Sequence, residues 1–248
     1  MSVQPRKKTA TRNHAQAVAF YDLDGTLSDL NLVHSTLYFL ANVAEWTGRV
    51  TYLLRFAARL PKLYLAEQRD RRLLNTTMFS TFEGISQDRL KMLGDLYCER
   101  ILAPRLYPQA IEIIEGNRAA GLEPVLVTGS PDFLVEPLAR LLEIKTFAAN
   151  RLVFSGGLAT GRLHEPVLGG EEKAAWCTEF AAEKGLDLRE CWGYTDSHHD
   201  LPFLAAVGHP VAVNPDRKLQ MTAQTRQWPI VHFVRGKRAP LPSPDARS

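Results

Sequence analysis

The stretch VAFYDLDGTLSD, residues 18–29, joins a short apolar run to two aspartates that stand one residue apart. Residues 17–22 have the length and the apolar composition of a buried strand. Two carboxylates held this close repel each other, and one of them tends to take up a proton. A bound cation is the usual way to keep both of them charged. The stretch therefore predicts a strand that ends in an acidic, ion-binding site.

The whole chain has the composition of an ordinary globular protein, with 248 residues, 45% of them hydrophobic and 23% charged. Its three cysteines, Cys98, Cys177 and Cys191, are far apart and odd in number, which indicates a reducing compartment rather than a disulfide framework or a zinc cluster. The N-terminus lacks an apolar signal core, and no window approaches about 18 uninterrupted apolar residues. We therefore expect a cytoplasmic protein without an integral membrane segment.

The positive charge of the chain is concentrated at its two ends. Residues 1–15 contain four basic and no acidic residues, and residues 235–248 contain four basic residues and one acidic residue. Because the net charge of the whole chain is +3, the body between the ends is acidic. We interpret both ends as disordered, solubilising tails and expect no nucleic-acid partner. Binding of nucleic acid or of an anionic membrane by the tails is the alternative.

The second half of the chain alternates between helical and strand patterns. Gly121 ends a helical segment at 109–121, and Ser130 before Pro131 has the pattern of a helix N-cap with proline at the first helical position. Two short strands around Ser155–Gly157 read as a hairpin. The expected strands lie at 123–130, 191–196, 210–214 and 229–233, and further helices at 131–144, 171–185 and 200–208. This alternation predicts an α/β protein with a Rossmann-like, open, mainly parallel sheet that carries helices on both faces.

Between about residues 30 and 103 the pattern is helical throughout. Apolar residues recur at helical spacing, and Gly48, Pro61 and Gly84 are expected to separate several helices. This block is interpreted as an inserted, all-helical cap. The expected organisation is a core of residues 16–28 and 105–234, a cap of residues 29–104, and the two tails.

Polar side chains follow three of the predicted strands. Asp22 and Asp24 follow the first, Thr128 the second, and Asp196 and Asp200 a third. In an open parallel sheet, ligands bind beyond the carboxyl ends of the strands, so these residues are expected on one rim.

The chemistry of this rim favours phosphate transfer. Its carboxylates suit Mg²⁺, which joins one or two acids to a substrate phosphate. One carboxylate can attack phosphorus, and another can protonate the leaving alkoxide. Gly25 lets a phosphate approach main-chain N–H groups, and Lys173 and Thr128 are candidates for neutralising its charge.

Four motifs in this order resemble the haloacid dehalogenase-like (HAD) phosphatase superfamily. They are DLDGTL, VLVTGS, a downstream lysine and YTDSHHDLPFL, and the resemblance covers nearly all of residues 17–234. The helical cap and the stretch GHPVAVNPD resemble the phosphoserine-phosphatase-like branch, subfamily IB. The resemblance implies a Mg²⁺-dependent enzyme.

The resemblance also implies a role for each site residue. It makes Asp22 the nucleophile and a metal ligand, and Asp24 the general acid and base, with its backbone carbonyl on the metal. It places Thr128 and Lys173 on the phosphoryl group, with Gly25 and Gly129 beside it. Asp196 becomes the third metal ligand, and Asp200 is its supporting acid, counted in the metal set.

Several positions keep an alternative. Ser130 is the rival of Thr128 as the phosphate-binding hydroxyl, and Lys184 is the rival of Lys173. His198 and His199 are either substrate contacts or surface polar residues, and they stay outside the catalytic set.

The substrate-reading part of the motif departs from that of phosphoserine phosphatases. They have an acid nine positions after the nucleophile, whereas this chain has Asn31, so L-phosphoserine is not the expected substrate. The arginines of the cap that could meet an anionic substrate are Arg69, Arg71, Arg72 and Arg89, and the sequence does not choose among them.

The leading hypothesis is a phosphomonoesterase that hydrolyses a small phosphorylated metabolite through an aspartyl-phosphate intermediate. A second is a peripheral membrane-associated phosphatase that acts on a lipid-like or amino-alcohol phosphate, because the apolar cap helices carry Trp46, Tyr52 and Tyr64. A third is a catalytically silent phosphate-binding module. The sequence leaves the oligomeric state open.

Overall fold

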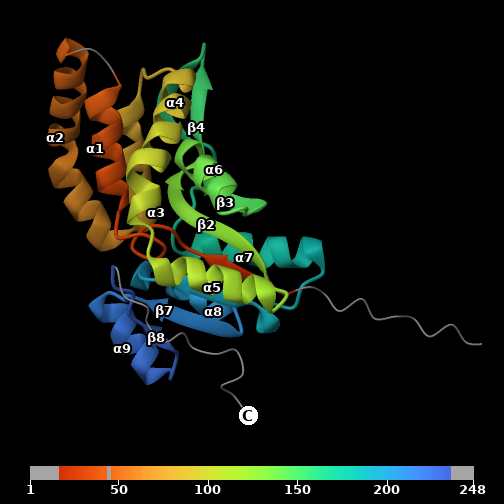
Figure 1. Ribbon diagram of the computed structural model, residues 1–248. Helices are drawn as coiled ribbons and strands as arrows, with labels where there is room; N and C mark the ends of the chain where they lie inside the picture. Colours follow the sequence, from red (N-terminus) through yellow and green to blue (C-terminus); the bar gives the residue numbers. More distant parts are fainter. Residues whose placement is uncertain (1–16, 44–45, 236–248) are drawn as a thin grey trace, which may run out of the picture.

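The computed structural model describes residues 17–43 and 46–235 of the chain (Figure 1). The tails predicted at 1–15 and 235–248 lie outside the described residues, except for Arg235. Along the described part, no helix combines the length and the apolar character needed to cross a bilayer.

The centre of the fold is a six-stranded sheet whose paired strands all run parallel. Its spatial order is β3-β2-β1-β6-β7-β8. From β1 the chain builds outward to β2 and β3 on one side and then to β6, β7 and β8 on the other, so β1 and β6 flank the switch point. The strands are β1 Val18–Tyr21, β2 Glu123–Pro131, β3 Thr146–Asn150, β6 Trp192–Thr195, β7 His209–Val213 and β8 Ile230–Val231.

Helices cover both faces of the sheet, as the sequence predicted. Along β1, Ala19 and Tyr21 join one buried apolar cluster while Val18 and Phe20 join a second one, because alternate side chains point to opposite faces. The first cluster contains residues of α5 (Pro108–Ala119) and α6 (Asp132–Leu141). The second contains residues of α7 (Glu171–Lys184), α8 (Leu201–Ala206) and α9 (Arg217–Thr225).

A buried asparagine ties the two central strands together. Asn117 of α5 donates hydrogen bonds to the hydroxyl oxygens of Tyr21 in β1 (2.6 Å) and Tyr194 in β6 (2.9 Å). The two tyrosine rings stack with their centroids 4.8 Å apart. These contacts fix β1 beside β6, and so they fix the loops that follow both strands.

The inserted block between β1 and α5 is helical, and its four longer helices stack beside one another above the sheet (Figure 1). They are α1 Leu32–Asn42, α2 Trp46–Arg69, α3 Arg71–Phe79 and α4 Gln87–Tyr97. Short helical turns follow at Ser80–Phe82, Cys98–Leu102 and Ala103–Arg105. Phe39 and Phe82 of this block form edge-on contacts with Phe133 of α6, at 5.1 and 5.9 Å between centroids. The block therefore packs on α6, a helix that covers the sheet. Its limits at 29 and 104 stay a prediction.

Two of the predicted helix breaks are wrong. Gly48 and Pro61 both lie inside α2, which runs without interruption from Trp46 to Arg69. Gly48 lies in the first turn, where a helix tolerates weak formers, and Pro61 is exposed while Phe56 and Leu63 are buried on either side of it. Packing of the buried face thus overrides the local preference of proline to end a helix. Gly84 does lie in a turn, with φ +85°.

The predicted hairpin is present and contacts the helical block. It consists of β4 Leu152–Ser155 and β5 Leu158–Leu163, which form a sheet of their own. Ala159 exchanges two backbone hydrogen bonds of 2.8 Å with the loop between α3 and α4, one with Gly84 and one with Ile85. The hairpin, which follows β3 in the chain, is therefore hydrogen-bonded to the cap. In Figure 1 its strand β4 lies beside α4.

Two elements were not predicted, namely β3 and α9. The β3 sequence TFAAN has polar residues at both ends and two alanines, which are weak strand formers, so its strand state depends on parallel pairing with β2. The α9 sequence is polar, and Asp216 is its N-cap residue, whose carboxylate accepts a hydrogen bond from the N–H of Leu219 (2.8 Å).

Candidate active site

The predicted acidic residues gather where β1 and β6 end, at the switch point of the sheet. Asp22 directly follows β1, and Asp196 directly follows β6. The backbone N–H of Asp22 donates to the carbonyl of Tyr194 (3.0 Å), so the pairing of the two strands continues up to the site. The sheet therefore brings together two aspartates that are 174 residues apart in the sequence.

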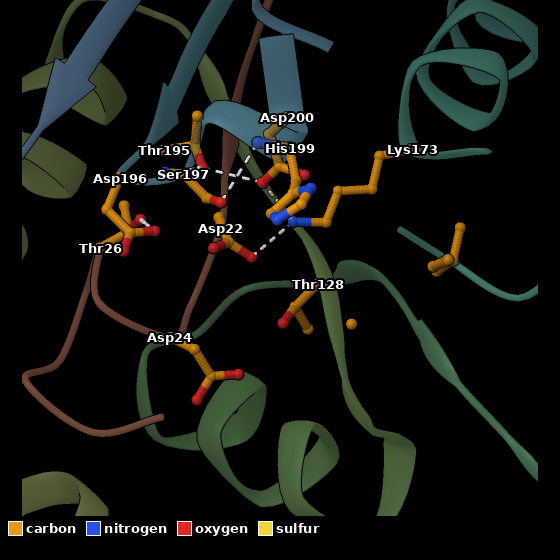
Figure 2. A network of polar contacts seen from close by, with 12 residues as sticks. Asp22, Asp24, Thr26, Thr128, Lys173, Thr195, Asp196, Ser197, His199 and Asp200 are labelled. Carbon is orange, nitrogen blue, oxygen red and sulfur yellow. Dashed lines mark hydrogen bonds and ion pairs between the residues drawn. The ribbon is translucent and has the colours of Figure 1, made fainter. Parts of the chain in front are cut away.

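Lys173 is the centre of a buried ion-pair network (Figure 2). Its Nζ donates to Asp22 Oδ1 at 2.8 Å and to Asp200 Oδ2 at 2.7 Å, and the residue is only 4% exposed. An ammonium group this deeply buried is stable only when paired. The network selects Lys173 over Lys184, whose Nζ lies near the Phe180 ring instead.

Asp200 is held in place by two donors. Besides the contact with Lys173, its Oδ2 accepts a hydrogen bond from the Thr195 hydroxyl (2.8 Å). Burial disfavours its charged form, but the Lys173 charge and the hydrogen bonds from Lys173 and Thr195 outweigh this and hold the pKa of Asp200 below its ordinary value. Asp200 thus stays ionised and fixes the lysine in position.

Asp24 has a different partner, Ser130. The Ser130 hydroxyl donates to Asp24 Oδ2 at 2.5 Å. Figure 2 shows Asp24 apart from the other labelled acids. Burial and repulsion from Asp22 raise the pKa of Asp24 to about 6. A carboxyl group with this pKa can both release and take up a proton near neutral pH.

The prediction that Ser130 caps the following helix is wrong. The helix α6 begins at Asp132, its N-cap residue is Pro131, and no side chain caps it there. The Ser130 hydroxyl instead binds an aspartate 106 residues away in the sequence.

Thr128 lies at an irregularity in β2. The strand continues past it to Pro131, and the register with β3 shifts between Val127 and Pro131. Thr128 is fully buried, and its Oγ1 accepts a hydrogen bond from the Ser130 N–H (3.1 Å). In Figure 2 it is drawn between Asp24 and Lys173.

Glycine allows close packing at two positions of this rim. Gly25 has φ +78°, and a Cβ there would lie 2.1 Å from Asp196 Oδ2. At Gly129 a Cβ would lie 2.8 Å from the amide nitrogen of Asn75, a buried residue of α3. Both glycines let side chains of the site approach the backbone closely.

Asp196 faces Gly25 and the Thr26 hydroxyl, which donates to its Oδ1 at 3.3 Å. Burial, with repulsion from Asp22 and Asp200, raises the pKa of Asp196 well above its ordinary value. Burial also raises the pKa of Asp22, against the opposing charge of Lys173. The site therefore concentrates more negative charge than Lys173 neutralises.

The chemistry of the donors fits Mg²⁺, since all are oxygens and carry excess negative charge. Within the described residues, however, no three His, Cys, Asp or Glu side chains are arranged to hold a metal ion. The carboxylates of Asp22, Asp24 and Asp196 bind Lys173, Ser130 and Thr26, respectively. A site built from two carboxylates and the Asp24 backbone carbonyl, as the resemblance implies, needs no third side chain. The metal set, including Asp200, stays a prediction.

A cavity of about 590 Å³ opens in front of the acids. Asp24, Gly25 and Asp196 line it from the sheet side, and Arg71 of α3 and Asn31 line it from the cap side. Of the four candidate cap arginines, Arg71 is the one that lines the cavity among those whose side chains the structure describes. Arg72 pairs with Glu165 at 2.9 Å, Arg89 donates to the carbonyl of Asn42, and the Arg69 side chain lies outside the described residues.

His198 and His199 also line this cavity. The Nδ1 of His198 lies 2.7 Å from Asp216 Oδ2, and its backbone N–H binds the same oxygen. The two imidazole rings lie 4.0 Å apart. The histidines are therefore at the mouth of the site, but the described contacts give them no role in catalysis.

The sequence did not point to Asn75 or Asp216, and it did not distinguish Arg71 from the three other candidate arginines of the cap. Asp216 carried a signal, because Asn-Pro-Asp before a polar helical segment is typical of an N-cap. Asn75, which donates to the Leu168 carbonyl at 2.8 Å, carried none, since its contact spans 93 residues.

A doubly wound parallel sheet with paired aspartates and a buried lysine at its switch point is the arrangement of an α/β enzyme that binds its ligand at the carboxyl ends of the strands. The model of the haloacid dehalogenase-like hydrolase family matches residues 19–205. A probable phosphatase of Mycobacterium tuberculosis (strain ATCC 25618 / H37Rv) is 30% identical over 246 residues, which cover 98% of this chain and 85% of that protein. The chain belongs to the haloacid dehalogenase-like hydrolase family.

Two further similarities refine this assignment. A phosphoserine phosphatase of the same M. tuberculosis strain is 31% identical over 227 residues, which cover 90% of this chain and 73% of that protein. The crystal structure of a protein of unknown function from Bordetella pertussis Tohama I matches with a TM-score of 0.75 at 26% identity, covering 87% of this chain and 98% of that one. The chain is thus a HAD phosphatase, similar to the phosphoserine-phosphatase-like branch.

Proposed function

We propose that this protein is a Mg²⁺-dependent phosphomonoesterase that hydrolyses a small phosphorylated metabolite through a phosphoryl group bound covalently to Asp22. The observation that carries the proposal is the buried Lys173, held between Asp22 and Asp200 at 2.8 and 2.7 Å. This pairing orients one oxygen of Asp22 and leaves the other for attack on phosphorus.

In the first step, an Asp22 carboxylate oxygen forms a bond to phosphorus while the bond from phosphorus to the ester oxygen breaks. Asp24 donates its proton to the departing alkoxide oxygen. The pKa of about 6, set by burial and by repulsion from Asp22, provides a protonated fraction for this task. The Thr128 hydroxyl and Lys173 bind the phosphoryl oxygens, beside Gly25 and Gly129.

In the second step, Asp24 takes a proton from water, and the water oxygen bonds to phosphorus. The bond between phosphorus and Asp22 breaks, which releases inorganic phosphate and restores the carboxylate. Ser130 holds Asp24 through its hydrogen bond of 2.5 Å during both transfers.

Asp22, Asp196 and the main-chain carbonyl of Asp24 would hold Mg²⁺, which supplies positive charge for the phosphoryl oxygens when bound. The excess of buried carboxylates over Lys173 supports this part of the proposal. The three cysteines are free and buried, which supports a reducing compartment and hence the cytoplasm.

The test is phosphate release from a panel of phosphate monoesters, including p-nitrophenyl phosphate, with Mg²⁺ and after its removal by EDTA. We expect activity that depends on Mg²⁺ and is abolished in Asp22→Asn. Asp88→Asn, at an exposed position of α4, is the matched control and should retain activity. A correctly folded wild-type protein that releases no phosphate from any ester would contradict the proposal and favour the silent binding module.

The outer face of α2 favours a second candidate, a membrane-associated phosphatase. Val50, Leu54 and Leu65 are exposed on this helix, as are the basic Arg55 and Lys62. No acidic residue occurs between residues 46 and 66. An exposed apolar stripe with a basic edge is typical of helices that lie on anionic lipid.

Of the aromatic residues behind this alternative, Tyr64 is exposed and Tyr52 is half-buried, while the Trp46 side chain and most of both tails lie outside the described residues. Co-sedimentation with vesicles of phosphatidylglycerol, compared with vesicles of phosphatidylcholine, tests the idea. Binding to the anionic vesicles that is lost in a Leu54→Gln/Leu65→Gln double variant would support it. If the protein sediments with neither kind of vesicle, the membrane-associated candidate is excluded.

A further inference from the structure

A second cavity adjoins the catalytic one inside the cap. It has a volume of about 230 Å³ and lies between α1, α2 and α3. Asn31 and Arg71 line both cavities, so the two spaces share a wall next to the acids. A group attached to a phosphate at the catalytic rim would therefore enter the second cavity past these two side chains.

The lining of this second cavity is apolar away from that wall. Phe56, Leu63, Leu74 and Met78 are buried and form its inner surface. Leu60 lies at its exposed edge. Among the residues that the structure describes, no acidic side chain lines it. The polarity of the space thus falls from the catalytic rim toward the interior of the cap.

The shared wall does not offer a negative charge to a substrate. The Asn31 side-chain oxygen accepts a hydrogen bond from the N–H of His34 (3.1 Å) and lies 2.9 Å from His34 Nδ1. This oxygen caps α1, and the amide is neutral. The other shared residue, Arg71, is positively charged. An ammonium group on a substrate would therefore meet no counter-charge here, and it would have to lose its water.

We propose that the substrate is a phosphate monoester whose alcohol carries an apolar group, and that this group occupies the second cavity. The inference rests on the proposed phosphatase function and names its substrate class. A cavity of about 150 Å³ is large enough for benzene, so this one accommodates a somewhat larger group, such as a short alkyl chain or a substituted aromatic ring. Amino-alcohol phosphates are disfavoured by the same lining.

The test compares kcat/KM for ethyl, butyl and hexyl phosphate, with 2-aminoethyl phosphate as the charged counterpart of the shortest ester. Ethanol, butanol and hexanol have similar acidity, so the comparison among their esters isolates the contact with the cavity. Protonated 2-aminoethanol is the more acidic leaving alcohol, so a lower kcat/KM for its ester cannot come from the leaving group. Each methylene that enters an apolar site strengthens binding enough to raise kcat/KM by about fourfold. We expect kcat/KM to rise with chain length and to be lowest for 2-aminoethyl phosphate.

A matched pair of variants on α2 assigns the effect to the cavity. Leu60 lines it and is 49% exposed, whereas Leu65 on the same helix is 52% exposed and does not line it. Leu60→Gln should lower the ratio of hexyl to ethyl phosphate kcat/KM by about fourfold or more, the value of one methylene. Leu65→Gln should leave this ratio unchanged.

Two failures are distinguishable. If p-nitrophenyl phosphate and the alkyl esters are hydrolysed but kcat/KM is equal for ethyl and hexyl phosphate, or highest for 2-aminoethyl phosphate, the substrate class is wrong while the phosphatase function stands. An equal change of the ratio in Leu60→Gln and Leu65→Gln also overturns the assignment of the cavity. If no ester is hydrolysed, the proposed function fails, and this inference fails with it.

Discussion

Asp24 carries the most demanding task of any single residue in the proposed mechanism, because it must first give up a proton and then take one. Its surroundings suit this task, since burial and the neighbouring Asp22 raise its pKa to about 6 while Ser130 fixes its orientation. Asp22 and Asp200, by contrast, are paired with Lys173. Carboxylates on one rim thus acquire different roles from their different partners.

The acid role of Asp24 predicts a dependence on the leaving group. In Asp24→Asn, hydrolysis of alkyl phosphates should fall by about 10²-fold or more, because an alkoxide leaves poorly without a proton. Hydrolysis of p-nitrophenyl phosphate should fall much less, since its phenolate leaves without help. Steady-state rates on both esters measure the difference. Equal losses on the two esters would rule out Asp24 as the acid.

At this scale the sequence predicted the site residues that stand in motifs. It missed those whose role depends on a contact with a residue far away in the sequence. Asp22, Asp196 and Lys173 lie where strand ends and motif order placed them, and the structure brings them to one rim. The contact of Ser130 with Asp24 spans 106 residues, and a local pattern favoured a helix cap there instead. Arg71 and Arg72 both lie on α3, and only the way this helix packs decides that Arg71 lines the catalytic cavity while Arg72 pairs with Glu165, which no local pattern reveals.

At the scale of elements, the close packing of α4 on α6 depends on one glycine. A Cβ at Gly94 of α4 would lie 1.9 Å from the Phe133 carbonyl oxygen of α6. Since this is backbone, the helices themselves would have to separate. A Cβ at Gly116, inside α5, would meet no neighbouring atom within 4 Å, so this glycine serves as the control.

We expect Gly94→Ala to lower the free energy of unfolding by about 2 kcal/mol or more. Gly116→Ala should raise it by up to about 1 kcal/mol, because alanine favours the helix over glycine. Urea unfolding followed by circular dichroism measures both. If Gly94→Ala left the free energy of unfolding unchanged, α4 and α6 would be able to move apart without loss of stability, which contradicts this prediction.

The elements of the sheet were predictable where apolar runs are strong, as for β1, β2, β6 and β7. The strand β3 was not, since its sequence is mixed and pairing with β2 decides its state. The helix α9 was not either, since its sequence is polar and its main local signal is the N-cap residue Asp216. The unbroken α2 shows the same limit, because burial of Phe56 and Leu63 outweighs the local signal of Pro61.

At the scale of the whole molecule, the acidic rim should cost stability when no cation is bound. The raised pKa values of Asp22, Asp24 and Asp196 arise mainly from burial, and they mean that the folded state binds more protons than the unfolded state at mildly acidic pH. Stability then falls as the pH rises through these folded-state values. The lowered pKa of Asp200, held down by Lys173, contributes only below about pH 4, outside this window.

In EDTA, the protein should therefore be more stable near pH 5.5 than near pH 8, by about 1 kcal/mol from Asp24 alone. Mg²⁺ should raise the melting temperature at pH 8 and reduce this difference, because at pH 8 it would neutralise the carboxylate charge that protons neutralise at pH 5.5. Thermal unfolding at both pH values, with and without Mg²⁺, measures the effect.

The variant Asp196→Asn provides the control for this experiment. It removes one buried charge, so we expect a higher melting temperature than wild type in EDTA at pH 8 and a smaller gain from Mg²⁺. If the metal-free wild type were instead more stable at pH 8, the acids would not be crowded as described.

The covalent step on Asp22 is the central claim, and trapping the intermediate tests it most directly. The protein is mixed with a phosphate monoester and Mg²⁺, quenched in acid during turnover, digested, and analysed by mass spectrometry. We predict one phosphoryl group on the aspartate at position 22, in the peptide that contains DLDGTL, and none in Asp22→Asn. Steady turnover with an unmodified Asp22, or a phosphoryl group on another residue, would contradict the mechanism.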